Sequence, residues 1–204
     1  MSDSSIAFYR KYRPETWDAV RGQDHIVKIL KAAIKGKSIG HAYLFTGSRG
    51  TGKTSVARIF AREAGVSAND IYEMDAASNR GIDEVRALRE AVETLPLESP
   101  YKVYILDEAH MLTKEAFNAL LKTLEEPPKH VIFILATTEL GKMPETIISR
   151  CEVHTFKKAT HTMLRDMVME TADAEGAKVE SAAADLIAIL GDGSFRDTHG
   201  TLQK

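Results

Sequence analysis

The residues from position 47 to position 54 have the types and spacing needed to hold a phosphate group. They read Gly47-Ser-Arg-Gly-Thr-Gly-Lys53-Thr54 and match the pattern G-x-x-x-x-G-K-[ST] in full. A glycine-rich loop of this length can aim several backbone N–H groups at one phosphate, and a helix beginning there adds its positive end. A strand pattern, Ala42–Thr46, precedes the loop, and an amphipathic helix pattern, Ser55–Glu63, follows it. We expect Lys53 to reach the β- and γ-phosphates and the Thr54 hydroxyl to bind Mg²⁺.

A glycine-rich turn of this composition can also occur by accident. Here the motif is complete and has the expected strand and helix on its two sides, so we prefer the functional interpretation. The residues predicted to contact the nucleotide phosphates are Gly47, Ser48, Arg49, Gly50, Thr51, Gly52, Lys53, Thr54 and Ser55.

A pair of acidic residues ends a second apolar segment. Val103–Leu106 reads Val-Tyr-Ile-Leu and is followed by Asp107 and Glu108. Alone, such a pair is usually a solvated strand end. Downstream of a phosphate loop, the first carboxylate is expected to hold Mg²⁺ and the second to polarise an attacking water. The sequence therefore predicts Asp107 as a metal ligand beside Thr54, and Glu108 as the catalytic base.

The string Asp107-Glu-Ala-His110 resembles a helicase motif. A helicase of that class needs a second nucleotide-binding domain, for which 204 residues leave no room. In addition, the strand pattern Ile71–Asp75 falls between the phosphate loop and the acidic strand. That order is expected for P-loop proteins with an inserted strand and a catalytic glutamate, so we reject the helicase interpretation.

Three further polar residues stand where they can act on a phosphate. Thr138 follows the apolar segment Val131–Ala136 and can orient water beside the γ-phosphate, although a local turn is an equal interpretation. Arg150 precedes the last strand pattern, and in a ring of subunits it could neutralise charge at a neighbour's nucleotide. Arg196 opens the last helix pattern and is either a surface residue or a phosphate sensor.

These residues must be positioned by an α/β fold. Apolar segments of strand length alternate with helical patterns, which predicts a parallel sheet flanked by helices. The segments at 103–106 and 131–136 are almost wholly apolar, as expected for central strands covered on both faces. The predicted strands are Ala42–Thr46, Ile71–Asp75, Val103–Leu106, Val131–Ala136 and Glu152–Phe156, and the predicted helices are His25–Lys35, Lys53–Glu63, Ile82–Thr94 and Lys114–Glu125.

From about Lys158 onward the chain becomes alanine-rich and helical in pattern, and Gly191-Asp-Gly193 predicts a break before the last helix. We expect a nucleotide-binding core over residues 1–157 and a small all-α lid over residues 158–204. The lid helices are predicted at Thr160–Glu175, at Ser181–Leu190 and from Ser194 to the end of the chain. The chain is expected to be part of a longer protein.

Composition limits the function classes. A hydrophobic fraction of 44% and a charged fraction of 27% are ordinary for a soluble globular protein, and a net charge of −2 argues against a strongly basic nucleic-acid binder. No apolar segment approaches the roughly 20 residues of a membrane span, and the start of the chain has no signal-peptide pattern. The single cysteine, Cys151, excludes an internal disulfide and favours the cytoplasm.

Several strings together resemble the gamma/tau subunits of bacterial DNA polymerase III, which are clamp-loader ATPases of the AAA+ class. The resemblance spans nearly the whole chain, and the string from 117 to 128 is highly specific. The strings are Tyr12–Pro14 with Gly22-Gln23, His41–Phe45, the phosphate loop, Asp75–Asn79, Asp107–Leu112, Phe117–Pro128, Ala136–Thr138 and Ser149–Cys151.

The resemblance implies ATP and Mg²⁺ as cofactors, and a motor that uses ATP to place a sliding clamp on primed DNA. Its implied partners are other clamp-loader subunits, the sliding clamp and the backbone of primed DNA. It also implies that Thr138 is the first sensor, that Arg196 is the lid sensor and that Arg150 acts in trans at an adjacent subunit.

Other roles come from the resemblance alone. Residues around Tyr12, Pro14 and Val20 are expected to line the adenine pocket. Arg80 lies in a turn that faces the DNA backbone in this family, and it is the candidate phosphate contact, although a solvated loop arginine is at least as good an interpretation.

The chain departs from the family in two respects. The family usually carries a four-cysteine zinc module before the Asp75 strand, whereas here Ala64–Asp70 fills that place without a cysteine, so no zinc site is expected. The family's collar domain would follow Lys204. Because that domain holds the oligomer together, the chain alone is expected to be monomeric and to hydrolyse ATP weakly.

Two other functions remain open. A non-hydrolysing scaffold subunit of the same assembly would tend to lose Lys53 or the acidic pair, and both are present. Another AAA+ motor of recombination or repair, such as a Holliday-junction motor, is disfavoured by the Phe117–Pro128 string and by Ser149-Arg-Cys151. A polymerase site is not expected, because no segment resembles the carboxylate cluster of a nucleotidyl-transfer site.

Overall fold

Five parallel strands form a single sheet in the computed structural model, which describes residues 6–204. The strand order is β2-β3-β4-β1-β5, so the two almost wholly apolar segments are neighbours near the centre of the sheet. The predicted α/β fold with a five-stranded parallel sheet is therefore confirmed. The strands are β1 (Ala42–Thr46), β2 (Ile71–Asp75), β3 (Lys102–Asp107), β4 (Val131–Thr137) and β5 (Glu152–Thr155).

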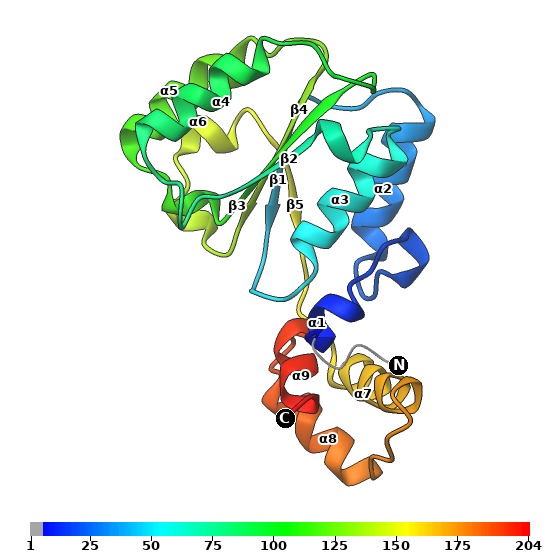
Figure 1. Cartoon of the computed structure of the whole chain (residues 1–204). Helices are drawn as coiled ribbons and strands as arrows, with labels where there is room; N and C mark the ends of the chain where they lie inside the picture. The colour runs from blue at the N-terminus through cyan, green and yellow to red at the C-terminus, as the bar shows by residue number, and fades with distance from the viewer. Residues whose placement is uncertain (1–5) are drawn as a thin grey trace.

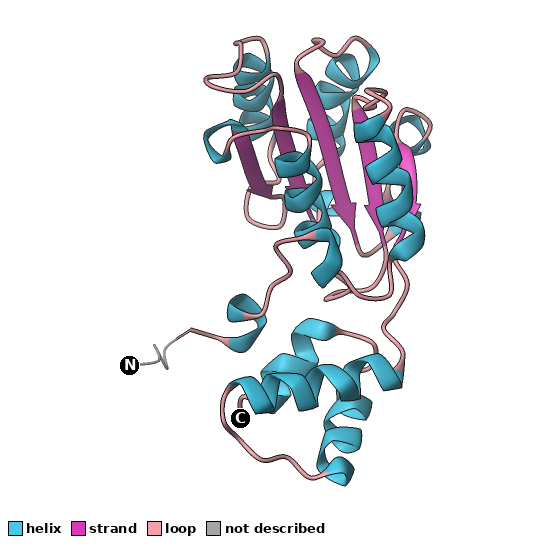
Figure 2. Cartoon of the chain, turned by 90° about the vertical axis from the view of Figure 1, so that its right-hand side faces the viewer, coloured by secondary structure: helices cyan, strands magenta, loops and turns pink. Residues whose placement is uncertain are grey.

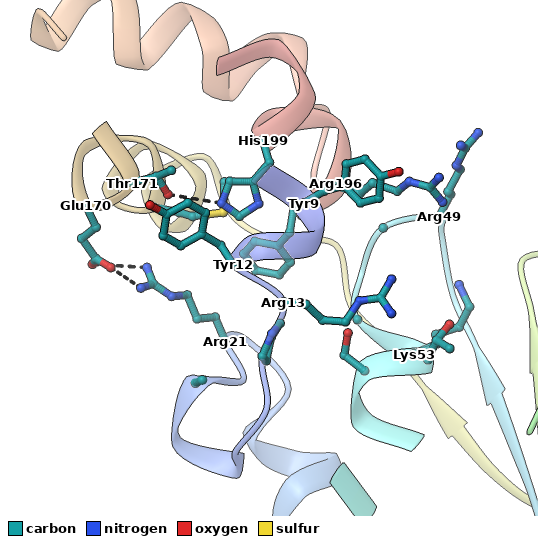
Figure 3. Close-up of a pocket in the computed structure, with 18 of the residues that line it drawn as sticks. Tyr9, Tyr12, Arg13, Arg21, Arg49, Lys53, Glu170, Thr171, Arg196 and His199 are labelled. Atoms are coloured by element: carbon teal, nitrogen blue, oxygen red, sulfur yellow. Dashed lines mark hydrogen bonds and ion pairs between the residues drawn. The ribbon is translucent and has the colours of Figure 1, made fainter. Parts of the chain in front are cut away.

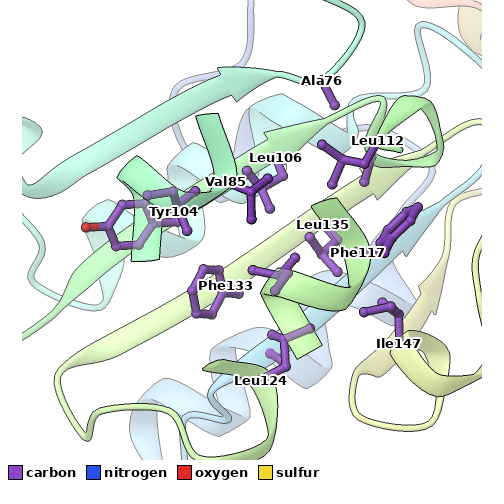
Figure 4. Close-up of a cluster of buried hydrophobic side chains, with 14 of the residues drawn as sticks. Ala76, Val85, Tyr104, Leu106, Leu112, Phe117, Leu124, Phe133, Leu135 and Ile147 are labelled. Carbon is purple, nitrogen blue, oxygen red and sulfur yellow. The ribbon is translucent and has the colours of Figure 1, made fainter. Parts of the chain in front are cut away.

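Helices cover both faces of this sheet (Figure 1). Along β4, Phe133 and Leu135 pack with α4, α5 and α6, whereas Ile132 and Ile134 pack on the opposite face with α2 and α3. This alternation follows from the two-residue period of a strand, and Figure 4 shows the first of the two clusters. The helices are α1 (Phe8–Lys11), α2 (Asp24–Lys35), α3 (Lys53–Glu63), α4 (Ile82–Val92), α5 (Lys114–Glu125), α6 (Glu145–Ile148), α7 (His161–Ala174), α8 (Ser181–Leu190) and α9 (Phe195–Leu202).

Four short 3₁₀ helices lie in the connections of the described chain: η1 (Trp17–Ala19), η2 (Ala68–Asp70), η3 (Ala109–Met111) and η4 (Leu140–Lys142). None of the helices within residues 6–204 is both long and apolar enough to cross a membrane.

Most predicted boundaries agree with the structure to within one or two residues. The helix predicted at Ile82–Thr94 ends instead at Val92, because the Ala91 carbonyl accepts hydrogen bonds from the side chains of Thr94 and Lys102. The last helix, predicted to continue to the end of the chain, ends at Leu202.

Helices α7, α8 and α9 pack together below the sheet, as Figures 1 and 2 show. The short helix α1 lies against α9, although the two are separated by most of the chain. The backbone N–H of Phe8 donates to the Gln203 side chain at 2.9 Å, and Lys11 pairs with Glu175 of the α7 C-terminus at 2.5 Å. The N-terminal segment is thus attached to the helical C-terminal part.

Candidate nucleotide-binding site

The loop between β1 and α3 is wrapped around the ammonium group of Lys53. The Lys53 Nζ donates to the carbonyls of Gly47 at 2.8 Å and Ser48 at 2.9 Å. Burial lowers the pKa of Lys53, and the nearby carboxylates of Glu108 and Asp107 oppose that shift. The ammonium group of Lys53 therefore places a positive charge inside the loop, where it can make charge-assisted hydrogen bonds to a nucleotide phosphate.

Glycine is required at two points of this loop. Gly52 has φ +99° at the N-terminus of α3, a conformation that L side chains rarely adopt. Gly50 has φ +74°, and a Cβ there would lie 2.0 Å from the Ser194 hydroxyl. The loop therefore turns tightly under the start of α9, and the Gly50 carbonyl accepts a hydrogen bond from the backbone of Phe195 at 3.0 Å.

The two predicted Mg²⁺ ligands are in contact. The Thr54 hydroxyl, in the first turn of α3, donates to Asp107 Oδ2 at 2.8 Å from the end of β3. Thr54 and Asp107 are 53 positions apart in the chain, yet their hydroxyl and carboxylate groups lie together. Both supply oxygen atoms, the type of ligand that Mg²⁺ prefers. The donor set fits an Mg²⁺ ion that also binds nucleotide phosphates.

Glu108 contacts the predicted sensor. Its backbone has φ +48°, which is uncommon for a residue other than glycine and concentrates at functional sites. The Thr138 hydroxyl donates to Glu108 Oε2 at 3.0 Å, and His110 Nδ1 lies 3.5 Å from the same oxygen. The ends of β3 and β4 therefore meet at this carboxylate.

A cavity of about 490 Å³ adjoins these residues and is lined by three parts of the chain (Figure 3). The loop and strand ends supply one wall, the N-terminal segment a second, and α7 with α9 the third. Predicted site residues that line it are Tyr12, Pro14, Arg49, Gly50, Gly52, Lys53, Thr54, Ser55, Asp107, Glu108 and Arg196.

The cavity has one basic and one aromatic end. Figure 3 shows Arg13, Arg49 and Lys53 on one side and the rings of Tyr12 and His199 on the other. The two rings are stacked, with centroids 5.7 Å apart. This division suits a ligand with a polyanionic part and a flat, apolar part.

His199 is a buried, uncharged member of the aromatic end. Its Nε2 lies 3.2 Å from the Thr171 hydroxyl. Burial, with Arg21 adding repulsion, lowers the pKa of His199 to about 4, so the ring is neutral near pH 7.

Val20 does not line the cavity. It is partly buried beside Trp17 in the apolar cluster of α2 and α3, whereas its neighbours Ala19 and Arg21 face the cavity. The turn of η1 directs Trp17 into the core, with Val20 beside it, and leaves Ala19 and Arg21 at the cavity.

Several lining residues were not predicted from the sequence. They come from the N-terminal segment, α7 and α9, and their types are ordinary for a helix surface or an interface between helices. The added residues include Tyr9, Arg13, Met167, Thr171, Phe195 and His199. Arg13 lies inside the Tyr12–Pro14 string, but the other five belong to no motif named above, so only the packing of distant segments reveals them.

Arg196 and Arg150 occupy different surfaces. Arg196 lines the cavity, and its guanidinium lies 4.9 Å from the ring centre of Tyr9. Arg150 lies outside it, between α5 and α6, where it donates to the Thr146 carbonyl at 2.5 Å and pairs with Glu125. The described chain therefore gives Arg150 no access to its own cavity.

Arg80 is exposed in the loop between β2 and α4, where its carbonyl accepts from Thr113. Among residues 6–204, no group of three or more His, Cys, Asp or Glu side chains is arranged to hold a metal ion.

Solved structures resemble this fold closely. The Holliday-junction branch migration motor RuvB of Thermotoga maritima superposes with a TM-score of 0.75 and 25% identity, over 93% of this chain and 63% of that one. A variant of the same motor gives a TM-score of 0.76 at 24% identity, with the same coverage of both chains. The fold is thus that of the AAA+ P-loop ATPases, with helices on both faces of the sheet, a phosphate loop and a helical C-terminal part.

Sequence comparison is more specific. A family model described as "DNA polymerase III, delta subunit" matches residues 64–160. DNA polymerase III subunit tau of Bacillus subtilis is 46% identical over 97% of this chain and 39% of its own length. The gamma/tau subunit of Mycobacterium tuberculosis is 42% identical over 98% of this chain and 38% of its own length.

The tau subunit of Escherichia coli is 40% identical over 92% of this chain and 32% of its own length, so the chain spans two fifths or less of these relatives. The identity to these relatives far exceeds the identity to the solved motors, and it extends over nearly all of the present sequence. The chain therefore belongs to the gamma/tau family of bacterial DNA polymerase III subunits.

Proposed function

We propose that this chain binds ATP with Mg²⁺ and hydrolyses it as a motor subunit of a bacterial clamp loader, in the cytoplasmic replisome. One observation carries the proposal: the Thr54 hydroxyl meets the Asp107 carboxylate at 2.8 Å, beside Lys53 and Glu108 and at the wall of a cavity. Phosphate binding, metal binding and water activation require these groups at one place.

Each residue has a defined role in this proposal. Lys53 and the loop N–H groups bind the β- and γ-phosphates, while Thr54 and Asp107 hold the ion that neutralises phosphate charge. Glu108 accepts the proton of the attacking water. Its contact with Thr138 restrains the carboxylate at the end of β4.

The remaining roles depend on parts of the chain outside the phosphate loop. Arg196 would bind the phosphates from α9, and the aromatic end with Tyr12 and Pro14 would hold the adenine base. We also propose that residues 158–204 form a lid domain separate from the core of residues 1–157. Arg150 would act on the ATP of an adjacent subunit, and Arg80 would contact the backbone of primed DNA.

The competing functions make different predictions. A scaffold subunit would not need Asp107 in contact with Thr54 or Glu108 in contact with Thr138, so the geometry favours an active ATPase. A recombination motor shares the fold, but the sequence identity to gamma/tau subunits favours replication.

The decisive experiment measures ATP binding and phosphate release by the chain alone and together with the sliding clamp, partner subunits and primed DNA. Glu108→Gln should leave ATP binding within about twofold and lower turnover by roughly 10²–10⁴-fold, since a positioned base contributes that much. Turnover that is unaffected by Glu108→Gln would refute the assigned site. Stimulation by another DNA structure, and none by clamp with primed DNA, would refute the replication role.

A further inference from the structure

His110 lies in a position that the proposed function does not explain. It belongs to η3, two residues after Glu108, and its side chain is only 5% exposed. Its Nδ1 is 3.0 Å from the Thr137 hydroxyl and 3.5 Å from Glu108 Oε2, and its Nε2 is 3.4 Å from Glu139 Oε1. One imidazole ring thus contacts the end of β4 and two carboxylates.

The end of β4 joins the phosphate loop to this ring. The Thr137 carbonyl accepts a hydrogen bond from the backbone N–H of Gly47, the first residue of the loop, at 3.2 Å. The Thr137 hydroxyl also accepts from the Glu139 backbone at 3.0 Å. Thr137 is fully buried and lies opposite Thr46 of β1 in the sheet. The Thr137 hydroxyl is therefore held rigidly, and its contact with Nδ1 restrains the His110 ring.

Glu108 is consequently connected to β4 in two ways. Thr138 donates directly to Oε2, and Thr137 acts through the ring of His110, which lies against the same oxygen. A carboxylate that must orient a water benefits from restraint on more than one side, because small displacements of a catalytic group are costly.

We propose that His110 is a positioning residue for ATP hydrolysis, which holds the Glu108 carboxylate against the buried end of β4. The role rests on the proposed function, since it requires Glu108 to act as the base. The ring does not line the cavity, so it acts through Glu108 and makes no contact with the nucleotide.

The test uses the full-length protein assembled with its partner subunits, clamp and primed DNA, and it measures kcat, KM and ATP affinity. His110→Ala should lower kcat by roughly 10- to 100-fold and leave ATP affinity within about twofold. His110→Asn should recover most of kcat because its amide takes the place of Nδ1. His110→Gln places its amide near Nε2 and should recover little.

Two further variants separate positioning from mere packing. Thr137→Val keeps the shape of a buried residue while removing its hydroxyl, and its effect on kcat should not add to that of His110→Ala. The matched control is His130→Ala, which removes a histidine just before the opposite end of β4, where it contacts the carbonyls of Val92 and Thr94. It should change thermal stability without a selective loss of kcat.

The outcomes are distinct. An unchanged kcat for His110→Ala, or a parallel loss of stability, affinity and kcat like that of His130→Ala, overturns the positioning role. If His110→Ala does not fold, the kcat values of His110→Asn and His110→Gln decide. A Gln variant as active as the Asn variant refutes the Nδ1 contact. If Glu108→Gln hydrolyses ATP at the wild-type rate, the proposed function and the role of His110 both fail. If only the His110 series is without effect, the proposed function stands.

Discussion

Replacing Arg150 by alanine should affect the isolated chain and the assembled complex very differently. In the chain alone Arg150 pairs with Glu125, and the two side chains are 32% and 49% exposed. Exposed ion pairs contribute about 0.2–1 kcal/mol. Arg150→Ala should therefore lower the melting temperature of the isolated chain by no more than about 2–4 °C and leave its ATP affinity unchanged.

In the assembly the same change should lower turnover by roughly 10³–10⁵-fold, the usual contribution of an arginine supplied to a neighbouring nucleotide. That loss corresponds to about 4–7 kcal/mol on the activation barrier. Breaking the pair with Glu125 costs less than about 1 kcal/mol, or a factor of roughly five. The ion pair with Glu125 is therefore too weak to keep Arg150 from reaching the nucleotide of a neighbouring subunit. Because Glu125→Gln removes only this small cost, it should raise the turnover of the assembly by no more than about fivefold.

The assay is phosphate release at saturating ATP, by assemblies that contain more than one copy of the chain. Mixing Arg150→Ala subunits with Lys53→Ala subunits should restore part of the turnover, because an intact Arg150 can then serve an intact ATP site across an interface. Arg165→Ala is the matched control, since Arg165 also pairs with a carboxylate and is 39% exposed. No recovery on mixing, or an equal loss of turnover in a monomeric sample, would refute action in trans.

Three further changes test how the cavity is held together. Gln23 is 1% exposed and makes two hydrogen bonds to the backbone of the link before α7, so Gln23→Ala should lower the free energy of unfolding by about 1–3 kcal/mol in denaturant titrations. His199 has a pKa of about 4 in the folded chain and about 6.5 in the unfolded chain. Its neutral form therefore contributes roughly 3 kcal/mol to the free energy of unfolding, which is fully present above pH 6.5 and is lost as the pH falls toward 4. Melting curves of His199→Gln should show a flatter pH dependence over that range, and an unchanged slope would contradict the assignment. Gly50→Ala should displace Ser194 and the start of α9 and weaken ATP binding by about 1–3 kcal/mol in calorimetry. Gly141→Ala is its control, since a Cβ there meets nothing within 4 Å and φ is not positive, and equal affinities for the two variants would count against the role of the turn.

The sheet could be predicted because its strands are short apolar segments separated by clear breaks. The ends of β1 and β2 and the bounds of α3, α5 and α8 follow from local signals alone. The end of α4 could not be predicted, because it depends on Lys102, which reaches back from β3 to the Ala91 carbonyl. A hydrogen bond between a helix and a strand does not change the hydrophobic periodicity of either segment, so the sequence pattern cannot indicate it.

The candidate site divides in the same way. The half proposed to bind phosphate is one contiguous motif plus an acidic pair, and both can be found from the sequence. The other half requires Tyr12 and His199 to stack although they lie near opposite ends of the chain, and a tyrosine or a histidine in a helical pattern carries no such signal. In the sequence, His110 stands in a helicase-like string and in the family string Asp107–Leu112, and neither indicates that its ring contacts Thr137 and Glu139.

The arrangement of these contacts separates ATP binding from ATP hydrolysis. The cavity is closed by the phosphate loop, by the N-terminal segment and by α9, and the N-terminal segment is tied to α7 through Arg21 and Glu170. Every group proposed to bind ATP is therefore supplied within one chain. The proposed trans arginine, Arg150, lies on another surface. Under the proposed function a single subunit can bind ATP fully yet remain slow to hydrolyse it, and assembly supplies the missing charge. Nucleotide binding can then precede assembly around DNA, and hydrolysis can follow it.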